Sequence, residues 1–308
     1  MNYEDLKKYC SIIYGIVGEK SISNEKITNS VVSNYYLKSA FFYRNAHSPE
    51  GAMHLPIEFS NKDSHKSKLL YQADYIHKII NENKFTNVLE LGCGMGFNTN
   101  HLAKKNPEVS FTGIDLTANN IKIAKEKNRE LENAQFSQGD FDKLDLSDKK
   151  YDLIFAVETL CYSQNLANLI SELGNNLNEN GRIIIFDGYE KHDVDELSKE
   201  YEKKAYQILS WGFALSNFQN MGDILESEKL KSYSIIEPVE YTENILPNYK
   251  TFQRGAERAL RYKFSLKILF KFRIISLALI KQLSAGLLGA YFFNNGFLGY
   301  FKLEFIKK

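Results

Sequence analysis

Strand-length and helix-length patterns alternate between residues 66 and 187, and this alternation limits the fold more than any other feature of the chain. The helical pattern "KLLYQADYIHKII" precedes the strand pattern "NVLELG", and helix and strand patterns then follow each other in "GFNTNHLAKK", "VSFTGIDL" and "TANNIKIAKEKNRELE". Further strand patterns are "AQFSQGD", "YDLIFAVE" and "GRIIIFDG", with helical "NLANLISELGNNL" between the last two. This order predicts βαβ units and a mostly parallel sheet.

The flanking segments break the alternation and define the expected domain organisation. Residues 1–65 are predicted to form an N-terminal helical cap, and residues 66–308 one α/β domain. Within that domain, helical patterns at about 188–231 and 245–285 predict helical insertions. The closing segment "FLGYFKLEFIKK" has the pattern of a further strand.

Composition excludes several classes of protein. A formal net charge of +1 over 308 residues disfavours a nucleic-acid partner, which usually requires a strong basic excess. The three cysteines are scattered, so no disulfide framework is expected, and no metal site is predicted from the His and Cys spacing. The first residues, "MNYEDLKKYC", lack an apolar secretory core, so a cytoplasmic location is expected.

A glycine-rich turn follows the first predicted strand, where Gly92, Gly94 and Gly96 alternate with other residues. Ligands of parallel sheets bind at the carboxyl ends of strands, and glycines there let backbone N–H groups approach a ligand closely. The G-x-G-x-G spacing differs from the G-x-G-x-x-G of dinucleotide sites. Glu90, just before the turn, would repel a pyrophosphate but attract an amino group.

The next two predicted strands also end in acidic residues. Asp115 is in the position where a carboxylate commonly holds ribose hydroxyls, and Leu116 beside it is placed in the same site. Asp140 could accept a hydrogen bond from an exocyclic amine, while Phe141 could pack on a purine; a turn cap is the alternative role for Asp140. An adenosine carrying a charged amino acid, S-adenosylmethionine, fits these positions.

The segments "VLELGCGMGFNT", "GIDLTANNIKIAKEK", "GDFDKLDL" and "YDLIFAVETLCY" together resemble the class I S-adenosylmethionine-dependent methyltransferases over residues 66–187. The resemblance implies an enzyme with S-adenosylmethionine as cofactor. It also implies a Rossmann-like, seven-stranded, mostly parallel α/β sheet with an antiparallel last strand, for which "FLGYFKLEFIKK" is suited. The expected cofactor-binding residues are Glu90, Gly92, Gly94, Gly96, Asp115, Leu116, Asp140 and Phe141.

The methyl acceptor must be inferred from the segments that flank residues 66–187. "SNYYLKSAFFYRN" and "GAMHLPI" are similar to the segment before the core in the cyclopropane-fatty-acid, sterol and tocopherol methyltransferase group. This implies a small, largely apolar acceptor (isoprenoid, sterol-like or lipid), with Tyr35 and Tyr36 at its site, for C- or O-methylation. Simple packing of these tyrosines onto the sheet is equally open. Trp211, the only tryptophan, is a further candidate for acceptor binding.

Glu158 and His54 are the candidate catalytic residues. Glu158 follows a predicted strand at the expected ligand edge, where a carboxylate could take a proton or stabilise a carbocation; bonding to backbone amides is the alternative. His54 is preferred over His47 and His192 as a general base. Two other functions stay open: O- or N-methylation of a polar metabolite or amine, and a non-catalytic cofactor-binding module.

Residues 258–283 contain seven basic residues and no acidic ones among many apolar side chains. The basic residues interrupt the stretch too often for a membrane span of about 20 apolar residues. A lid helix that packs one apolar face on the domain is the favoured interpretation. Peripheral contact with a membrane is the alternative.

Overall fold

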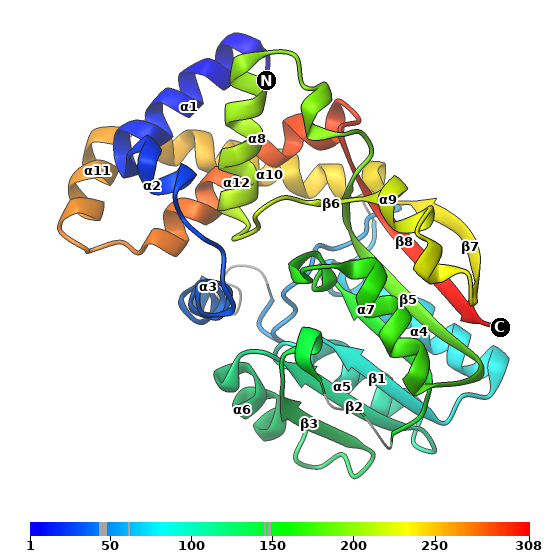
Figure 1. Cartoon of the computed structure of the whole chain (residues 1–308). Helices are drawn as coiled ribbons and strands as arrows, with labels where there is room; N and C mark the ends of the chain where they lie inside the picture. The colour runs from blue at the N-terminus through cyan, green and yellow to red at the C-terminus, as the bar shows by residue number, and fades with distance from the viewer. Residues whose placement is uncertain (43–47, 61, 145, 147–148) are drawn as a thin grey trace. The chain divides into compact units, whose positions relative to one another are not determined.

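The computed structural model describes residues 1–42, 48–60, 62–144, 146 and 149–308 (Figure 1). The chain divides into two compact units, each built from three separate segments. The helical unit comprises Met1–Ser39, Tyr189–Asn220 and Thr242–Gly299. The sheet unit comprises Ala40–Gly188, Met221–Tyr241 and Tyr300–Lys308. This division differs from the predicted boundary at residue 65, because residues 40–65 belong to the sheet unit.

The main sheet has the strand order β3-β2-β1-β4-β5-β8-β7. Its strands are β1 (Asn87–Leu91), β2 (Ser110–Asp115), β3 (Ala134–Gln138), β4 (Tyr151–Val157), β5 (Leu177–Glu190), β7 (Tyr233–Glu240) and β8 (Leu298–Lys307). Neighbouring strands from β3 to β5 pair in parallel, whereas β7 and β8 pair antiparallel. The predicted mostly parallel sheet with an antiparallel closing strand is therefore confirmed. The short β6 (Gln219–Asn220) pairs with the end of β5 in the helical unit.

The helices of the sheet unit follow the predicted alternation. They are α4 (His65–Asn83), α5 (Phe97–Lys105), α6 (Ala118–Lys127), α7 (Leu166–Leu173) and the short α9 (Met221–Leu225). The side chain of Ser64 caps α4 by accepting from the Ser67 N–H. The helix buries one apolar face, which consists of Leu69, Ala73, Ile76, Ile79 and Ile80. α6 ends at Lys127, earlier than its sequence pattern predicts.

The helical unit contains the helices α1 (Tyr3–Val17), α2 (Glu19–Ser23), α3 (Asn29–Phe42), α8 (Glu200–Gly212), α10 (Thr242–Leu260), α11 (Lys263–Lys271) and α12 (Leu277–Asn294). α3 continues three residues past the unit boundary. α12 packs against both α8 and α10. Small residues allow the close approach: a Cβ on Gly289 would lie 2.4 Å from the Tyr249 ring. α1 packs against α8 and α11.

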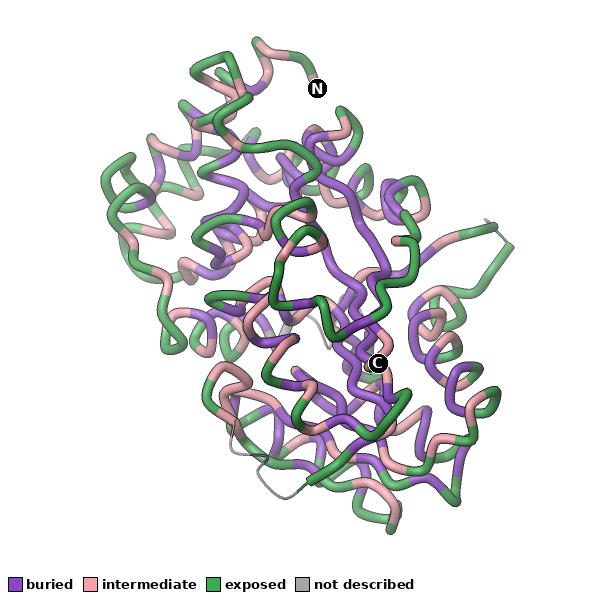
Figure 2. The backbone as a smooth tube through the Cα atoms, turned by 45° about the vertical axis from the view of Figure 1, so that its right-hand side comes forward, coloured by how far each residue is buried: buried purple, intermediate pink, exposed green. Residues whose placement is uncertain are grey.

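Buried residues are concentrated in the strands of the sheet. β8, which ends at the C-terminus, is buried along most of its length (Figure 2), as are the central residues of β1, β4 and β5. β4 and β5 carry continuous apolar runs, as expected for strands covered on both faces, whereas buried charged residues interrupt the apolar sequences of β1 and β8. Within the described part of the chain, no helix is both long enough and apolar enough to cross a bilayer.

Candidate functional site

The glycine turn joins β1 to α5, and its three glycines all have left-handed backbone, with φ of 70°, 53° and 77°. The N–H groups of Gly92 and Cys93 donate to the Ile114 carbonyl of β2 at 2.7 and 3.0 Å. A Cβ on Gly92 would lie 2.0 Å from Thr159 Cγ2, and one on Gly96 would lie 2.8 Å from Asn128 Nδ2. Both conformation and space therefore require glycine at these positions.

Glu90, in β1, is fully buried behind the turn. Its carboxylate accepts hydrogen bonds from Asn98 Nδ2 at 3.0 Å, from the Thr99 N–H at 3.2 Å and from the Thr99 hydroxyl. These donors belong to the first turn of α5, so Glu90 satisfies N–H groups that a helix start leaves unpaired. Burial raises the pKa of this carboxyl to about 7. Contact between Glu90 and a ligand amino group stays a prediction.

Asp115 ends β2 beside the turn. Its carboxylate accepts from the Gly94 N–H at 3.0 Å, the Thr117 N–H at 2.8 Å and Asn120 Nδ2 at 3.2 Å. Burial raises the pKa of Asp115 even though these donors favour its charged form. The residue thus ties the glycine turn to the start of α6. A ribose contact by Asp115 stays a prediction.

Leu116 and Asp140 have local roles at the neighbouring strand ends. The Leu116 carbonyl accepts from Gln138 Nε2 at 3.0 Å. The Asp140 carboxylate accepts from the Asp142 N–H at 3.1 Å and lies 3.5 Å from Lys143 Nζ, capping a short 3-10 helix that begins at Phe141. The turn-cap alternative for Asp140 is thus present in the structure, and the adenine contacts of Asp140 and Phe141 stay predictions.

Residues 48–58 lie over the glycine turn, within the sheet unit. A Cβ on Gly94 would lie 3.3 Å from Met53 Sδ, and Lys127 Nζ donates to the Glu50 carbonyl at 2.6 Å. His54 is buried, with its ring 5.7 Å from that of Phe97. These contacts connect residues 48–58 to the sheet unit.

The three histidines considered as bases lie in different surroundings. His54 Nε2 donates to the Leu69 carbonyl of α4 at 2.9 Å, so one ring nitrogen is engaged by the backbone. His192, in the helical unit, is exposed and lies 3.5 Å from Glu196. His47 lies outside the described residues. A catalytic role for His54 stays a prediction.

Glu158 follows β4 and has a left-handed backbone, with φ of 51°. Its Oε1 accepts from the Leu55 N–H at 2.7 Å and from the Tyr300 hydroxyl at 2.9 Å. Burial, together with the nearby Asp187 carboxyl, raises the pKa of Glu158 to about 8. Glu158 therefore ionises less readily than an ordinary glutamate. The hydrogen bond from the Leu55 N–H agrees with the alternative role for Glu158, in which its carboxylate bonds to backbone amides.

The surroundings of Glu158 contain functional candidates that sequence reasoning missed. Asp187, in β5, accepts from the N–H groups of Cys161 at 3.0 Å and Gly188 at 2.9 Å, and burial raises its pKa to about 6. Gln72 Nε2 donates to the Leu55 carbonyl at 3.0 Å. Asp187 could have been found by the rule that identified Asp115, an acid near a strand end. Tyr300 could not, because it comes from β8, far along the chain.

An aromatic cluster adjoins this network in the sheet unit. It consists of Phe59, Tyr71, Tyr75, Phe186 and Tyr241, with ring centroids 4.8 to 6.2 Å apart between neighbours. The hydroxyls of Tyr71 and Tyr241 are 3.0 Å apart. The backbone connects the cluster to Glu158, because the Tyr241 N–H donates to the Tyr300 carbonyl and the Glu158 N–H to the Phe186 carbonyl.

Tyr35, Tyr36 and Trp211 lie in the helical unit. Tyr35 packs against Ala214 and Ala278, with the Tyr36 ring 5.3 Å away. Trp211 is buried, and Lys281 Nζ lies 5.0 Å from its ring centroid. These contacts are internal to the unit, and acceptor binding by the three aromatics stays a prediction. Within the described residues, no group of His, Cys, Asp and Glu is placed to hold a metal ion.

Comparison with known proteins gives one family. Residues 82–236, half of the chain, match the family model described as "Methyltransferase domain". The chain is 30% identical over 129 residues to the sterol 24-C-methyltransferase of Saccharomyces cerevisiae, covering 39% of this chain and 32% of the relative. It is 24% identical over 169 residues to a fatty-acid O-methyltransferase of Mycolicibacterium smegmatis, covering 55% and 60% of the two chains. The chain thus spans about a third of the length of the sterol methyltransferase and about three fifths of the length of the fatty-acid methyltransferase.

Among solved structures, the mycolic acid cyclopropane synthase CmaA1, complexed with SAH and CTAB, superposes with a TM-score of 0.73 at 12% identity. The superposition covers 92% of this chain and all of that one. At this identity the likeness concerns the fold. The family match, the strand order and the glycine turn agree: the chain belongs to the methyltransferase-domain family and has the fold of the class I S-adenosylmethionine-dependent methyltransferases.

Proposed function

We propose that the protein transfers a methyl group from S-adenosylmethionine to a small, largely apolar acceptor of the sterol, fatty-acid or isoprenoid kind, in the cytoplasm. The observation that carries the proposal is the shared edge of the glycine turn, Asp115 and Glu158. The turn follows β1, Asp115 ends β2 and Glu158 follows β4, and these three strands are adjacent and parallel in matching register. This is the edge where ligands of such sheets bind.

The residues around the turn fit the cofactor. Within the described part of the chain, the buried Oδ1 atoms of Asn98 and Asn120 have no hydrogen-bond partner. Both asparagines bond to the acids beside the turn, Glu90 and Asp115. These free acceptors suit the ammonium and hydroxyl groups of S-adenosylmethionine, because buried acceptors without a donor would otherwise stay unsatisfied. The cofactor would supply a methyl group on a positively charged sulfur.

Glu158 is the proposed holder of the acceptor proton. Its raised pKa keeps it protonated in the empty site, and a positive charge bound nearby would lower that pKa toward the ionised form. The carboxylate could then accept a proton while Tyr300 donates to it. The aromatic cluster next to Tyr300 provides apolar surface for an acceptor and ring faces that stabilise cationic character.

The apolar acceptor is supported by the cluster and by the relatives. The named relatives act on a sterol and on fatty acids, and the solved neighbour is a mycolic acid cyclopropane synthase. The half-exposed Phe59, at 57% exposure, gives the cluster a side open to solvent. The three tyrosine hydroxyls of the cluster are bonded within the protein, Tyr71 to Tyr241 and Tyr75 to Glu304, so the cluster offers a polar acceptor few hydrogen-bonding groups.

Two measurements test the proposal. Calorimetry with S-adenosylmethionine should show binding, and its absence would rule out both the enzyme and a cofactor-binding module. A labelled-methyl assay across sterol, fatty-acid, isoprenoid and polar extracts should then show transfer to apolar acceptors. Transfer confined to polar acceptors would contradict the apolar assignment.

Variants assign the proton-holding role. Glu158→Gln should bind the cofactor with unchanged affinity but lose on the order of a hundredfold or more in turnover, as loss of a general base usually does. Glu179→Gln, at an exposed position of β5, is the matched control and should keep wild-type activity. Wild-type turnover in Glu158→Gln would eliminate the role.

A further inference from the structure

One face of α11, continued by Phe272 directly after the helix, carries two parallel rows of side chains. Phe264, Ile268 and Phe272, spaced four residues apart, are 75%, 56% and 69% exposed. Lysines 263, 267 and 271 form a second row, displaced by one residue from the first. Positions four apart lie on one face of a helix, so the rows run side by side. No residue of α11 is buried.

This apolar row is not a normal solvent-facing surface. A surface helix normally turns its polar face outward, and here the exposed face holds two phenylalanines and an isoleucine. Tyr262 before the helix and Ile274 after it are also about 70% exposed. Scattered single apolar residues are ordinary on a surface, but a contiguous group marks a binding surface.

The charged residues in the sequence around the apolar row are all basic. Residues 258–303 contain no Asp or Glu. Within the described residues, Lys263, Lys267, Lys271 and Arg273 make no ion pair with a carboxylate. Their positive charge is thus available to an anionic partner.

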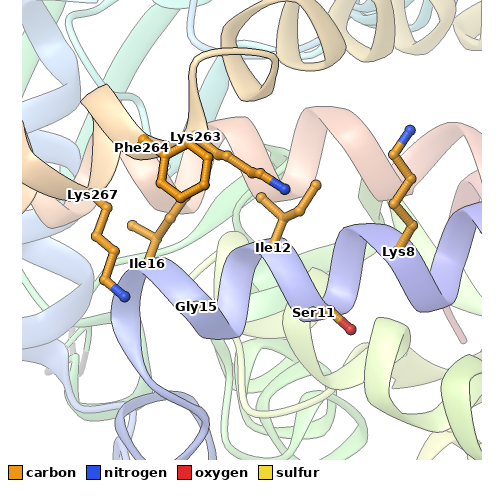
Figure 3. A pocket seen from close by; sticks show the side chains of 8 residues that line it. All are labelled: Lys8, Ser11, Ile12, Gly15, Ile16, Lys263, Phe264 and Lys267. Carbon is orange, nitrogen blue, oxygen red and sulfur yellow. The ribbon is translucent and has the colours of Figure 1, made fainter.

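A hollow lies between α1 and α11, with a volume of about 400 Å³. Lys8, Lys263 and Lys267 line it together with Ser11, and the apolar side is formed by Ile16 and Phe264 (Figure 3). In Figure 3 the side chains of Lys263 and Lys267 extend from α11 toward α1, while Gly15 leaves the α1 side open. A Cβ on Gly15 would meet nothing within 4 Å. The lining thus combines ammonium groups with apolar surface.

We propose that the α11 face docks on an anionic phospholipid membrane, with one headgroup phosphate in the hollow between α1 and α11. Aromatic and aliphatic side chains would enter the interface, while the lysines bind phosphates at headgroup level. Charge complementarity selects this occupant: a second copy would bring a like-charged face, which repels. The proposal is independent of the methyl acceptor.

Vesicle sedimentation of the full chain tests the docking. The protein should sediment with vesicles of phosphatidylcholine mixed with phosphatidylglycerol at low salt, and much less with phosphatidylcholine alone. Lys263→Gln/Lys267→Gln should lower the partition coefficient by on the order of tenfold or more, since each basic residue near an anionic leaflet contributes about a fivefold factor. Lys20→Gln/Lys203→Gln, at exposed positions of the same unit, is the charge-matched control and should bind normally.

Two further variants separate the apolar row from the hollow. Phe264→Ser/Phe272→Ser should weaken binding even at high salt, where the electrostatic part is screened. Gly15→Leu should fill the hollow and reduce the preference for phosphatidylglycerol without changing any charge. Gly255→Leu, at a helical glycine with equally open surroundings, is its control. Circular dichroism checks that each variant is folded.

The proposal is overturned if the wild-type chain does not sediment with the anionic vesicles. It is also overturned if the chain forms a dimer that Phe264→Ser/Phe272→Ser abolishes, because the face would then be an interface between copies. Unchanged binding in Gly15→Leu would exclude the hollow as the headgroup site. Calorimetry with S-adenosylmethionine should be unaffected in all these variants, so a failure here differs from a failure of the proposed methyl transfer.

Discussion

Glu158 makes the stability of the protein depend on pH. The pKa of Glu158 is about 8 in the folded chain and 4.5 ordinarily. Between pH 4.5 and pH 8 the folded chain therefore binds more protons than the unfolded chain. Stability therefore falls as pH rises through this window. Glu158→Gln keeps an oxygen to accept from Leu55 and Tyr300 but cannot ionise. We expect its melting temperature to match the wild type at pH 5 and to exceed it by at least about 5 °C at pH 8.

Thermal unfolding followed by circular dichroism at both pH values measures this difference. Glu90 also has a raised pKa and remains in the variant, so its contribution cancels in the comparison. Asp187 interacts with Glu158, so the difference between the two pH values reports the titration of this pair of carboxyls. An equal difference between variant and wild type at pH 5 and pH 8 would show that Glu158 does not ionise in this window.

Gly92 is the position of the turn with the least room for a side chain. Gly92→Ala places a Cβ against Thr159 and keeps a left-handed backbone, so we expect it to lower the unfolding free energy by about 3 kcal/mol or more. Gly255→Ala in α10 has open space and should instead stabilise by about 0.5–1 kcal/mol. Urea denaturation measures both. Similar effects of the two variants would contradict the steric argument.

The strand β8 is held in the sheet by a buried charge network. Glu304 of β8 accepts from Arg182 of β5 at 2.6 Å, from the Tyr75 hydroxyl of α4 at 3.0 Å and from Lys302 at 3.2 Å. Burial opposes ionisation of Glu304, but Arg182 and Lys302 hold its pKa below the usual value. The network thus joins two strands and a helix through one carboxylate.

Removing that carboxylate leaves the buried Lys302 and the partly buried Arg182 without their shared counter-charge. Glu304→Gln should lower the unfolding free energy by about 3–5 kcal/mol, the usual cost of breaking a buried ion pair from one side. Glu237→Gln, at an exposed position of the adjacent β7, is the control and should change stability by less than about 0.5 kcal/mol. Chemical denaturation compares the two, and a near-neutral Glu304→Gln would show that the network does not stabilise β8.

The two units are interleaved along the chain, so neither is a continuous stretch. A fragment of residues 40–190 contains the glycine turn, Asp115 and Glu158 but lacks β8, the neighbour of β5. It would expose the edge of β5, whose residues Ile183–Phe186 are fully buried in the whole chain. We expect this fragment to aggregate, because an unpaired apolar edge recruits other strands. Size-exclusion chromatography checks this, and a monodisperse folded fragment would contradict it.

The sequence predicted the part of the fold in which local pattern and structure coincide. β4 and β5 contain apolar runs bounded by turn residues, and the glycine turn, Asp115 and Glu158 lie directly at the ends of predicted strands. The contacts of Glu158 could not be predicted, because Leu55 and Tyr300 reach it from segments 103 and 142 positions away. The place of residues 48–58 in the sheet unit was not predicted for the same reason, because their contacts with the turn and with α6 are long-range.

The strained, buried position of Glu158 sets stability against activity at one residue. Its left-handed backbone costs about 1–3 kcal/mol, and burial makes ionisation of its carboxyl unfavourable. If the carboxyl holds the acceptor proton, Glu158→Gln, which keeps an oxygen for Leu55 and Tyr300 but cannot ionise, would make the chain harder to unfold above neutral pH and the enzyme slower. Selection for heat resistance alone would therefore drive glutamate out of this position, and only selection for turnover would keep it.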